Sequence, residues 1–244
     1  MMRYPRRMTG VIAISSALAL TLSAGIAQAA SPAKPLAEAL KGTVWQLESF
    51  TSMDDSIGVK RPENPENYTL YLNHEGRAGL RLDCNRAMGG WSAEAGQGDA
   101  KTGDQYGQFR FTPLAGTMAM CPPGSMGQEI LRQTGNITGF ALRDGKLHLS
   151  LKADAGIYNW TPLAKVPASP AQGGPANWQV TGVNSWLNLR KSATTRSDVL
   201  AHLKAGTELA SKGCDYRNDR VWCEVATPDG KTGFVAHDYL KSAR

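Results

Sequence analysis

The sequence predicts a mainly β protein of two small domains, an antiparallel β domain with one helix followed by a small β-barrel. Three observations predict it. Short β-favouring runs recur along most of the chain, only one segment has a good helical pattern, and a stretch rich in proline and glycine divides the chain in its last third. Of the 244 residues, about 215 follow an N-terminal leader, which suits one large domain or two small ones.

The leader is typical of a secretory signal peptide. Arg3, Arg6 and Arg7 form a basic start, the apolar run VIAISSALALTLSAGIA follows, and AQA at 27–29 fits a small-x-small cleavage site. A retained anchor would need about 20 strongly apolar residues, and this run is shorter and rich in Ser, Thr and Gly. We expect cleavage after Ala29, a periplasmic or secreted protein, and no membrane span in the mature chain.

The charge of the chain does not support nucleic-acid binding. The full sequence has 27 basic and 21 acidic residues, a net charge of +6, and removing the three leader arginines lowers it to +3. The excess forms no run of about five like charges. We therefore expect no nucleic-acid partner, whereas a mild attraction to anionic envelope polymers fits the charge.

Strand-like runs dominate the first domain, which we place at residues 40–163. TVWQLESF, YTLYLN, AGLRLD and FRFTPL each favour a short strand, and IYNWTPL favours a closing one. FALRDGKLHLSL is the clearest local signal. Two alternating runs flank Asp144 and Gly145, which both tolerate the positive φ of a type I′ hairpin turn.

One helix is predicted, in the segment SMGQEILRQTG. Ser125 is expected to cap it, with Gln128 as the capping-box partner, and Gly135 stands where a C-terminal cap belongs. Ile130 and Leu131 would face the sheet. The helix would lie over an antiparallel sheet or inside a curled one.

A linker is predicted at residues 164–177 and a second domain at 178–242. The linker contains several prolines and the pair Gly173 and Gly174. The second domain is a series of short strand-like runs: WLNLR, SDVLAHL, TELASKG, RVWCEVA, KTGFVA and DYLKSA. A tight turn is expected at Pro228-Asp229-Gly230. About 65 residues of this kind usually close into a small barrel.

The four cysteines divide evenly between the two halves of the chain. An exported chain with an even cysteine count normally pairs them. Three pairings are possible, and the simplest keeps one bridge inside each half: Cys84 with Cys121, and Cys214 with Cys223. Chain entropy would give the longer loop about 4 kcal/mol of stabilisation and the shorter about 2.7 kcal/mol.

Three separated motifs of the first domain occur in the order found in a known family. GTVW at 42–45, DCNRAMGGW at 83–91 and GTMAMCPPG at 116–124 are followed by the helical segment and the GKLHL hairpin. This order resembles the META domain of HslJ-type envelope proteins. The resemblance implies a compact, mainly β fold with one helix. It also implies an association with stress and antibiotic tolerance rather than with an established reaction.

Within this resemblance, Asn85 and Thr117 stand at positions of the family motif. The chain departs from the family at Ala119, which occupies its Met position, with Met118 and Met120 on either side. The departure leaves any role of the family Met unassigned in this chain.

The second domain is similar to a bacterial SH3 domain. LNLRKSATTRSDVLAHLKAGTEL matches the opening of that family, and VWCEVATPDGKTGFVAHDYL matches its ending. Ala193 and Thr194 replace the usual pair in the first loop, and Phe234 stands where Trp is commoner. The resemblance implies an SH3-like barrel, and the departures leave its ligand unspecified.

Sulfur-bearing residues cluster in GTMAMCPPG. Met118, Met120, Met126 and Cys121 offer the soft ligands that Cu(I) prefers. However, Met118 and Met120 would share one face of a strand, as two core residues do, and methionine often fills gaps in cores. We therefore expect packing rather than a metal site, and no cofactor. A Cu(I)-binding envelope protein remains an alternative function.

No catalytic constellation is recognisable. The chain contains neither a serine nucleophile elbow nor an HExxH motif. Four histidines fall in none of the zinc or protease spacings: His74, His148, His202 and His237. We therefore expect a protein that is not an enzyme.

The second domain is the candidate binding module, because aromatic side chains with nearby cations suit peptides or glycan strands. Trp222 is expected in the core beside Cys223. The candidate ligand-binding residues are Trp186, Arg190, Tyr216 and Tyr239. We expect docking on peptidoglycan or an envelope protein. The alternative is an inhibitor or chaperone-like protein that acts on an exported enzyme through RPENPENY or GQGDAKTGDQYG.

Overall fold

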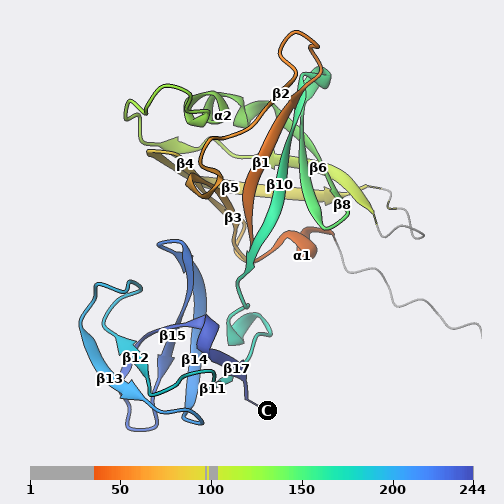
Figure 1. Ribbon diagram of the computed structural model, residues 1–244. Helices are drawn as coiled ribbons and strands as arrows, with labels where there is room; N and C mark the ends of the chain where they lie inside the picture. Colours follow the sequence, from red (N-terminus) through yellow and green to blue (C-terminus); the bar gives the residue numbers. More distant parts are fainter. Residues whose placement is uncertain (1–35, 97, 99–103, 244) are drawn as a thin grey trace, which may run out of the picture. The chain divides into compact units, whose positions relative to one another are not determined.

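The computed structural model describes residues 36–96, 98 and 104–243 (Figure 1). The predicted signal peptide and the central part of GQGDAKTGDQYG lie outside these residues. Among the described residues, the structure has no helix long and apolar enough to cross a membrane.

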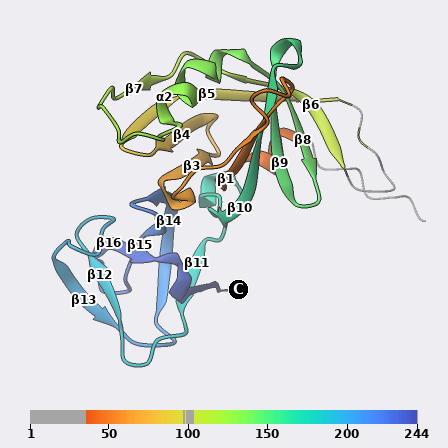
Figure 2. The ribbon, with the colours of Figure 1, turned by 45° about the horizontal axis from the view of Figure 1, so that its top comes forward.

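Eight antiparallel strands of the first domain close into a barrel. The order is β1, β3, β4, β5, β6, β8, β9 and β10, and β10 pairs with β1, which lies beside it in Figures 1 and 2. The strands are β1 (Thr43–Ser52), β3 (Tyr68–Leu72), β4 (Arg77–Leu82), β5 (Asn85–Ala95), β6 (Gln105–Phe111), β8 (Ile137–Arg143), β9 (Lys146–Leu151) and β10 (Gly156–Lys165). Of the two arrangements the sequence allows, the sheet is therefore the curled one.

Side chains that alternate along the strands fill the barrel. On β9, Leu147, Leu149 and Leu151 are buried while the residues between them are half exposed. Tyr158 and Trp160 of β10 are almost fully buried in the same cluster. Two short strands outside the barrel path, β2 (Val59–Lys60) and β7 (Ala115–Gly116), pair with β1 and β5.

Strand β5 is the longest strand of the barrel, and the sequence patterns did not predict it. Its sequence NRAMGGWSAEA has an asparagine and a glycine pair, which favour strands weakly. It forms because β4 and β6 supply hydrogen-bonding partners on its two sides. By contrast, the hairpin between β8 and β9 is as predicted, with φ of 50° at Asp144 and 73° at Gly145.

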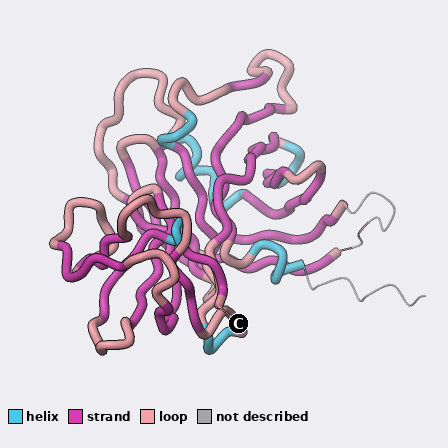
Figure 3. Tube along the Cα trace, turned by 60° about the horizontal axis from the view of Figure 1, so that its bottom comes forward, coloured by secondary structure: helices cyan, strands magenta, loops and turns pink. Residues whose placement is uncertain are grey.

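Helices are short throughout the described chain, as the tube in Figure 3 shows. α1 (Leu36–Leu40) precedes the barrel, and α2 (Gly127–Gln133) lies beside β4. The remaining helical segments are 3-10 turns: η1 (Pro65–Asn67), η2 (Thr134–Asn136), η3 (Lys152–Asp154), η4 (Pro170–Gln172) and η5 (His237–Tyr239).

The predicted capping box of α2 is wrong. The helix begins after Met126, and no side chain caps it. The hydroxyl of Tyr68 accepts the Met126 N–H at 3.1 Å and lies 3.3 Å from the Ser125 hydroxyl. The Ser125 hydroxyl accepts the Gly127 N–H at 3.3 Å rather than the N–H three residues further on that a capping box requires. Ile130 still packs into the barrel core, as predicted.

The second domain is one antiparallel sheet of seven strands, in the order β13, β12, β16, β15, β14, β11 and β17. The strands are β11 (Asn177–Val180), β12 (Leu187–Arg190), β13 (Val199–Leu203), β14 (Glu208–Arg217), β15 (Arg220–Ala226), β16 (Thr232–Ala236) and β17 (Leu240–Ser242). The turn expected at Pro228-Asp229-Gly230 joins β15 to β16, and Gly230 has a φ of 81°. Between β10 and β11 the chain forms only η4.

Close packing around Gly107 of β6 predicts that a side chain at this position lowers stability. A Cβ there would lie 2.1 Å from the Glu94 carbonyl oxygen and 2.7 Å from the Phe140 ring. Gly107→Ala should lower the free energy of unfolding by about 1–3 kcal/mol, because the neighbouring strand cannot move without breaking the barrel. Gly79→Ala is the matched control, since nothing lies within 4 Å of its Cβ position. Urea unfolding that gives both variants wild-type stability would contradict this packing.

Candidate functional site

Both disulfides that the sequence predicts are present, and they use all four cysteines of the chain. Cys214 and Cys223 lie directly opposite each other on β14 and β15. Cys84 lies in the two-residue turn between β4 and β5, where Leu82 pairs with Asn85. Its bond to Cys121 therefore ties the tip of a hairpin to a segment 37 residues later in the chain.

A buried amide holds the same segment. Asn85 is only 2% exposed, and its side-chain oxygen accepts the Thr117 hydroxyl at 2.9 Å and the Ala119 N–H at 2.8 Å. Its side-chain nitrogen donates to the Ala119 carbonyl at 2.9 Å and to the Cys121 sulfur at 3.1 Å. Two donors and two lone pairs are thereby satisfied, which is what a buried amide requires.

Thr117 adds a further connection to the same hairpin. Its hydroxyl accepts the Arg86 N–H at 3.0 Å, and its own N–H donates to the Arg86 carbonyl at 2.9 Å. We call residues 84–86, together with Thr117, Ala119 and Cys121, the clasp. The two family-motif residues, Asn85 and Thr117, therefore have a structural role, because they position the segment 117–121.

The clasp leaves the intervening methionines in solvent. Met118 is 74% exposed and Met120 is 94% exposed. The prediction that they pack is wrong, because residues 117–121 form no strand and only the alternate residues turn toward Asn85. Met126 is 7% exposed inside the barrel core and Cys121 is a disulfide, so the set of four sulfur ligands for Cu(I) is not assembled.

The second candidate site is a groove of about 500 Å³ on the second domain. The segment 182–188, which leads into β12, forms one wall, and Thr195 lies in the loop after β12. Tyr239 of η5 and Ala236 of β16 also line the groove. We call this feature the aromatic groove.

Trp186 is the exposed aromatic side chain of the groove. It is 55% exposed, and its ring lies 4.9 Å from that of His202 at an angle of 53°. His202 is held in turn by a hydrogen bond of 2.9 Å between its Nδ1 and the Asn188 side-chain oxygen. Because Asn188 and His202 are paired across β12 and β13, the sheet itself positions the indole.

Both charged side chains that line the groove are arginines, Arg190 and Arg220. One Arg190 nitrogen donates to the Ser197 carbonyl at 2.8 Å, which fixes the side chain but uses only part of its five donors. Arg220 is paired with Asp238 at 3.1 Å. Trp222 lies buried at the groove, as expected of a core residue.

The structure brings together three of the four predicted ligand-binding residues: Trp186, Arg190 and Tyr239 line the groove. Tyr216 does not. It lies on β14, where it packs in a hydrophobic cluster with Val221, and its ring centre is 5.9 Å from that of Tyr71. Tyr216 is therefore not part of the aromatic groove, and a role for it as a ligand contact stays a prediction.

Sequence reasoning placed neither Asn184 and Asn188 at the groove nor His202 against Trp186. The two asparagines could have been predicted from the VNSWLN stretch, where they flank Trp186. Polar side chains beside an exposed aromatic residue are common in ligand-binding sites. His202 carries no such signal, since only the pairing of β12 with β13 brings it to Trp186.

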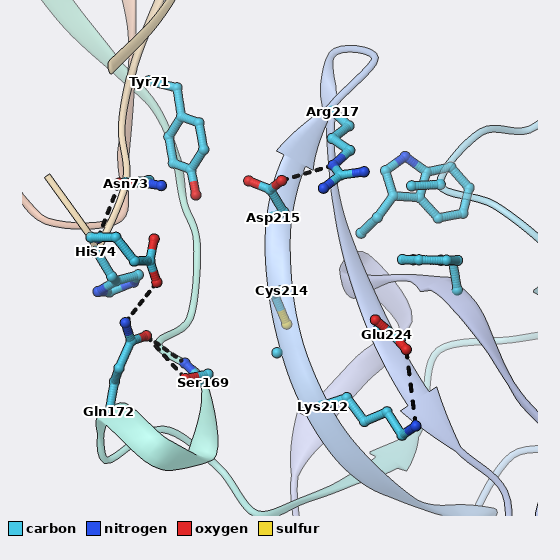
Figure 4. A pocket seen from close by; sticks show the side chains of 15 residues that line it. Tyr71, Asn73, His74, Ser169, Gln172, Lys212, Cys214, Asp215, Arg217 and Glu224 are labelled. Carbon is cyan, nitrogen blue, oxygen red and sulfur yellow. Dashed lines mark hydrogen bonds and ion pairs between the residues drawn. The ribbon is translucent and has the colours of Figure 1, made fainter. Parts of the chain in front are cut away.

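Another hollow, of about 280 Å³, is lined by residues that include Tyr71, Glu75, Gln172 and part of the β14–β15 hairpin. Figure 4 shows it from close by. Its polar groups are already engaged with one another. The pairs are Lys212 with Glu224 at 4.0 Å, Arg217 with Asp215 at 2.7 Å, and Gln172 with Glu75 at 2.6 Å. Burial raises the pKa of Tyr71 far above its ordinary value, and the Asp215 carboxylate adds to it, so this hydroxyl stays neutral. The aromatic groove is therefore the better candidate site.

Fold and site together define a disulfide-bonded protein of two β domains with an exposed aromatic groove, a class that includes small binding modules. Comparison with protein families matches residues 38–158 to the META domain and residues 185–241 to the bacterial SH3 domain. The chain is thus a META domain followed by a bacterial SH3 domain, in the predicted order. These domains support a binding or envelope-associated role.

No curated protein matches the chain. Among solved structures, a DUF4847 family protein from Bacteroides vulgatus is similar, with 12% identity and a TM-score of 0.32 over 51% of this chain and 94% of that one. A likeness at this level carries no argument about function.

The clasp predicts a large effect of removing the Asn85 amide. Asn85→Ala leaves buried partners without hydrogen bonds, so the free energy of unfolding should fall by about 2–4 kcal/mol. Asn184→Ala, on an exposed asparagine of the other domain, should change it by no more than about 0.5 kcal/mol. Denaturant unfolding of the wild type and the two variants, with a signal from each domain, measures these changes in the free energy of unfolding. Equal, small effects of the two substitutions would show that the amide contributes nothing.

Proposed function

We propose that the protein is an exported, non-catalytic protein of the cell envelope whose SH3 domain docks on peptidoglycan through the aromatic groove. The observation that carries the proposal is the combination of an exposed, positioned Trp186 with Arg190 and Arg220 in one groove.

The tryptophan suits a glycan or a peptide. Sugar rings and peptide planes present flat apolar faces that stack on an indole, and a large aromatic side chain contributes much of the binding energy at such sites. Asn184 and Asn188 line the groove on the same segment and offer amide donors and acceptors to hydroxyl or peptide groups. His202 keeps the indole in place, so little conformational entropy is lost on binding.

The arginines suit the acidic part of the polymer. Peptidoglycan stem peptides carry carboxylates, and guanidinium groups bind carboxylates with two parallel hydrogen bonds. Among the residues that the structure describes, no acidic side chain lines the groove, and the Asp238 carboxylate is already paired with Arg220. A neutral or basic ligand would find no complementary charge in the groove.

The remaining part of the proposal concerns location and the META domain. Two disulfides are typical of proteins in an oxidising compartment, which supports export. Docking of the SH3 domain would hold the META domain at the cell wall, where the stress tolerance associated with META domains would be exercised. The groove holds no nucleophile with a partnered base, which supports a non-catalytic role.

The test is sedimentation of the full protein with purified peptidoglycan. Wild-type protein should cosediment, and Trp186→Ala should weaken binding by about 10-fold or more, because it removes the stacking surface. Leu200→Ala is the matched control for loss of an exposed apolar side chain, since Leu200 lies on β13 and does not line the groove.

A second pair isolates the charge. Arg190→Lys should weaken binding, because the compact ammonium cannot form the two-pronged contact, whereas Arg217→Lys outside the groove should have no effect. Wild-type sedimentation no greater than that of an unrelated protein of similar charge would refute the docking. Release of soluble fragments from the polymer during the assay would refute the non-catalytic part.

A further inference from the structure

The exposed methionines of the clasp suggest a chemical role that is independent of the aromatic groove. Met118, at 74% exposed, and Met120, at 94%, are the most exposed large apolar side chains of the described residues. Met118 and Met120 alternate with Thr117, Ala119 and Cys121, the three residues that the clasp binds. The backbone that turns the polar groups of Thr117 and Ala119 toward Asn85 leaves the two intervening thioethers in solvent.

The thioethers are also the most readily oxidised sulfur atoms available in the described chain. A thiol would react with oxidants before methionine does, but all four cysteines are in disulfides. The other described methionines are less accessible: Met88 is 57% exposed, Met53 is 51% exposed and Met126 is 7% exposed. An oxidant that reaches this domain therefore meets Met120 and Met118 first.

We propose that Met118 and Met120 form a reversible oxidation site for peroxides and related two-electron oxidants. The sulfur lone pair attacks one oxygen of hydrogen peroxide, the O–O bond breaks, and a sulfur–oxygen bond forms. The second oxygen leaves as water with both protons, so the thioether is oxidised to a sulfoxide and the peroxide is reduced to water. Each event converts an apolar surface group into a polar hydrogen-bond acceptor.

The fold tolerates this change because neither side chain supports it. The clasp contacts are made by Asn85, Thr117, the Ala119 backbone and the Cys121 sulfur, and none of them involves a methionine sulfur. Oxidation of Met126, inside the barrel core, would by contrast place a polar oxygen among apolar side chains. The site can therefore cycle between thioether and sulfoxide while the domain stays folded.

The test exposes the full purified protein to millimolar hydrogen peroxide and follows each methionine by peptide mass mapping. Met118 and Met120 should gain about 16 Da each and react at least about 10 times faster than Met126, with Met88 and Met53 between them. The thermal midpoint of the oxidised protein should stay within about 2 °C of the untreated one, which corresponds to a small change in stability. Methionine sulfoxide reductases A and B should restore the original mass.

The double variant Met118→Leu/Met120→Leu is the control. It should lose the fast oxidation while Met53, Met88 and Met126 keep their rates. Oxidation of Met118 and Met120 no faster than that of Met53 would overturn the proposal. Loss of the folded state at two sulfoxides, or failure of both reductases to act, would overturn the reversible part.

Discussion

The conformation of residues 117–121 in the META domain depends on the hydrogen bonds of the buried Asn85 amide. Residues 117–121 have no strand partner, so their backbone groups need other hydrogen-bond partners. The Asn85 amide partners both backbone groups of Ala119 and the Thr117 hydroxyl, and the Arg86 carbonyl accepts the Thr117 N–H. The Cys84–Cys121 disulfide links the end of this segment covalently to the hairpin of β4 and β5. The paired strands of that hairpin hold both Cys84 and Asn85. The result is a segment without regular structure that nevertheless has one conformation.

In the aromatic groove, too, contacts with neighbouring side chains position an exposed residue, Trp186. An exposed indole would lose rotational freedom on binding, but contact with His202 fixes Trp186 in advance, and Asn188 fixes His202. The Cys214–Cys223 disulfide joins β14 to β15, and β15 carries both Arg220 and Trp222 of the groove. In each domain a disulfide therefore ties down a strand or hairpin next to the candidate site.

The sequence predicted the features that depend on neighbouring residues or on the cysteine count, and it missed those that depend on distant contacts. Asp144 and Gly145 specify their hairpin because both accept a positive φ. The even cysteine count, with two cysteines in each half of the chain, led to the correct pairs. Strand β5 escaped prediction because its partners β4 and β6 outweigh its weak propensity. The exposure of Met118 was missed for a related reason. Only the contacts of Asn85, a residue 33 positions away, show that the segment is not a strand.

Amide hydrogen exchange at Ala119 tests the central claim, that the clasp holds residues 117–121 in one conformation. The Ala119 N–H donates to the buried Asn85 oxygen at 2.8 Å, so its exchange should be at least about 100-fold slower than in an unstructured peptide. The protection should be present in the wild-type protein and lost in Asn85→Ala. Exchange of the wild-type Ala119 amide at the unstructured rate would contradict the account, because the segment would then sample many conformations despite its disulfide.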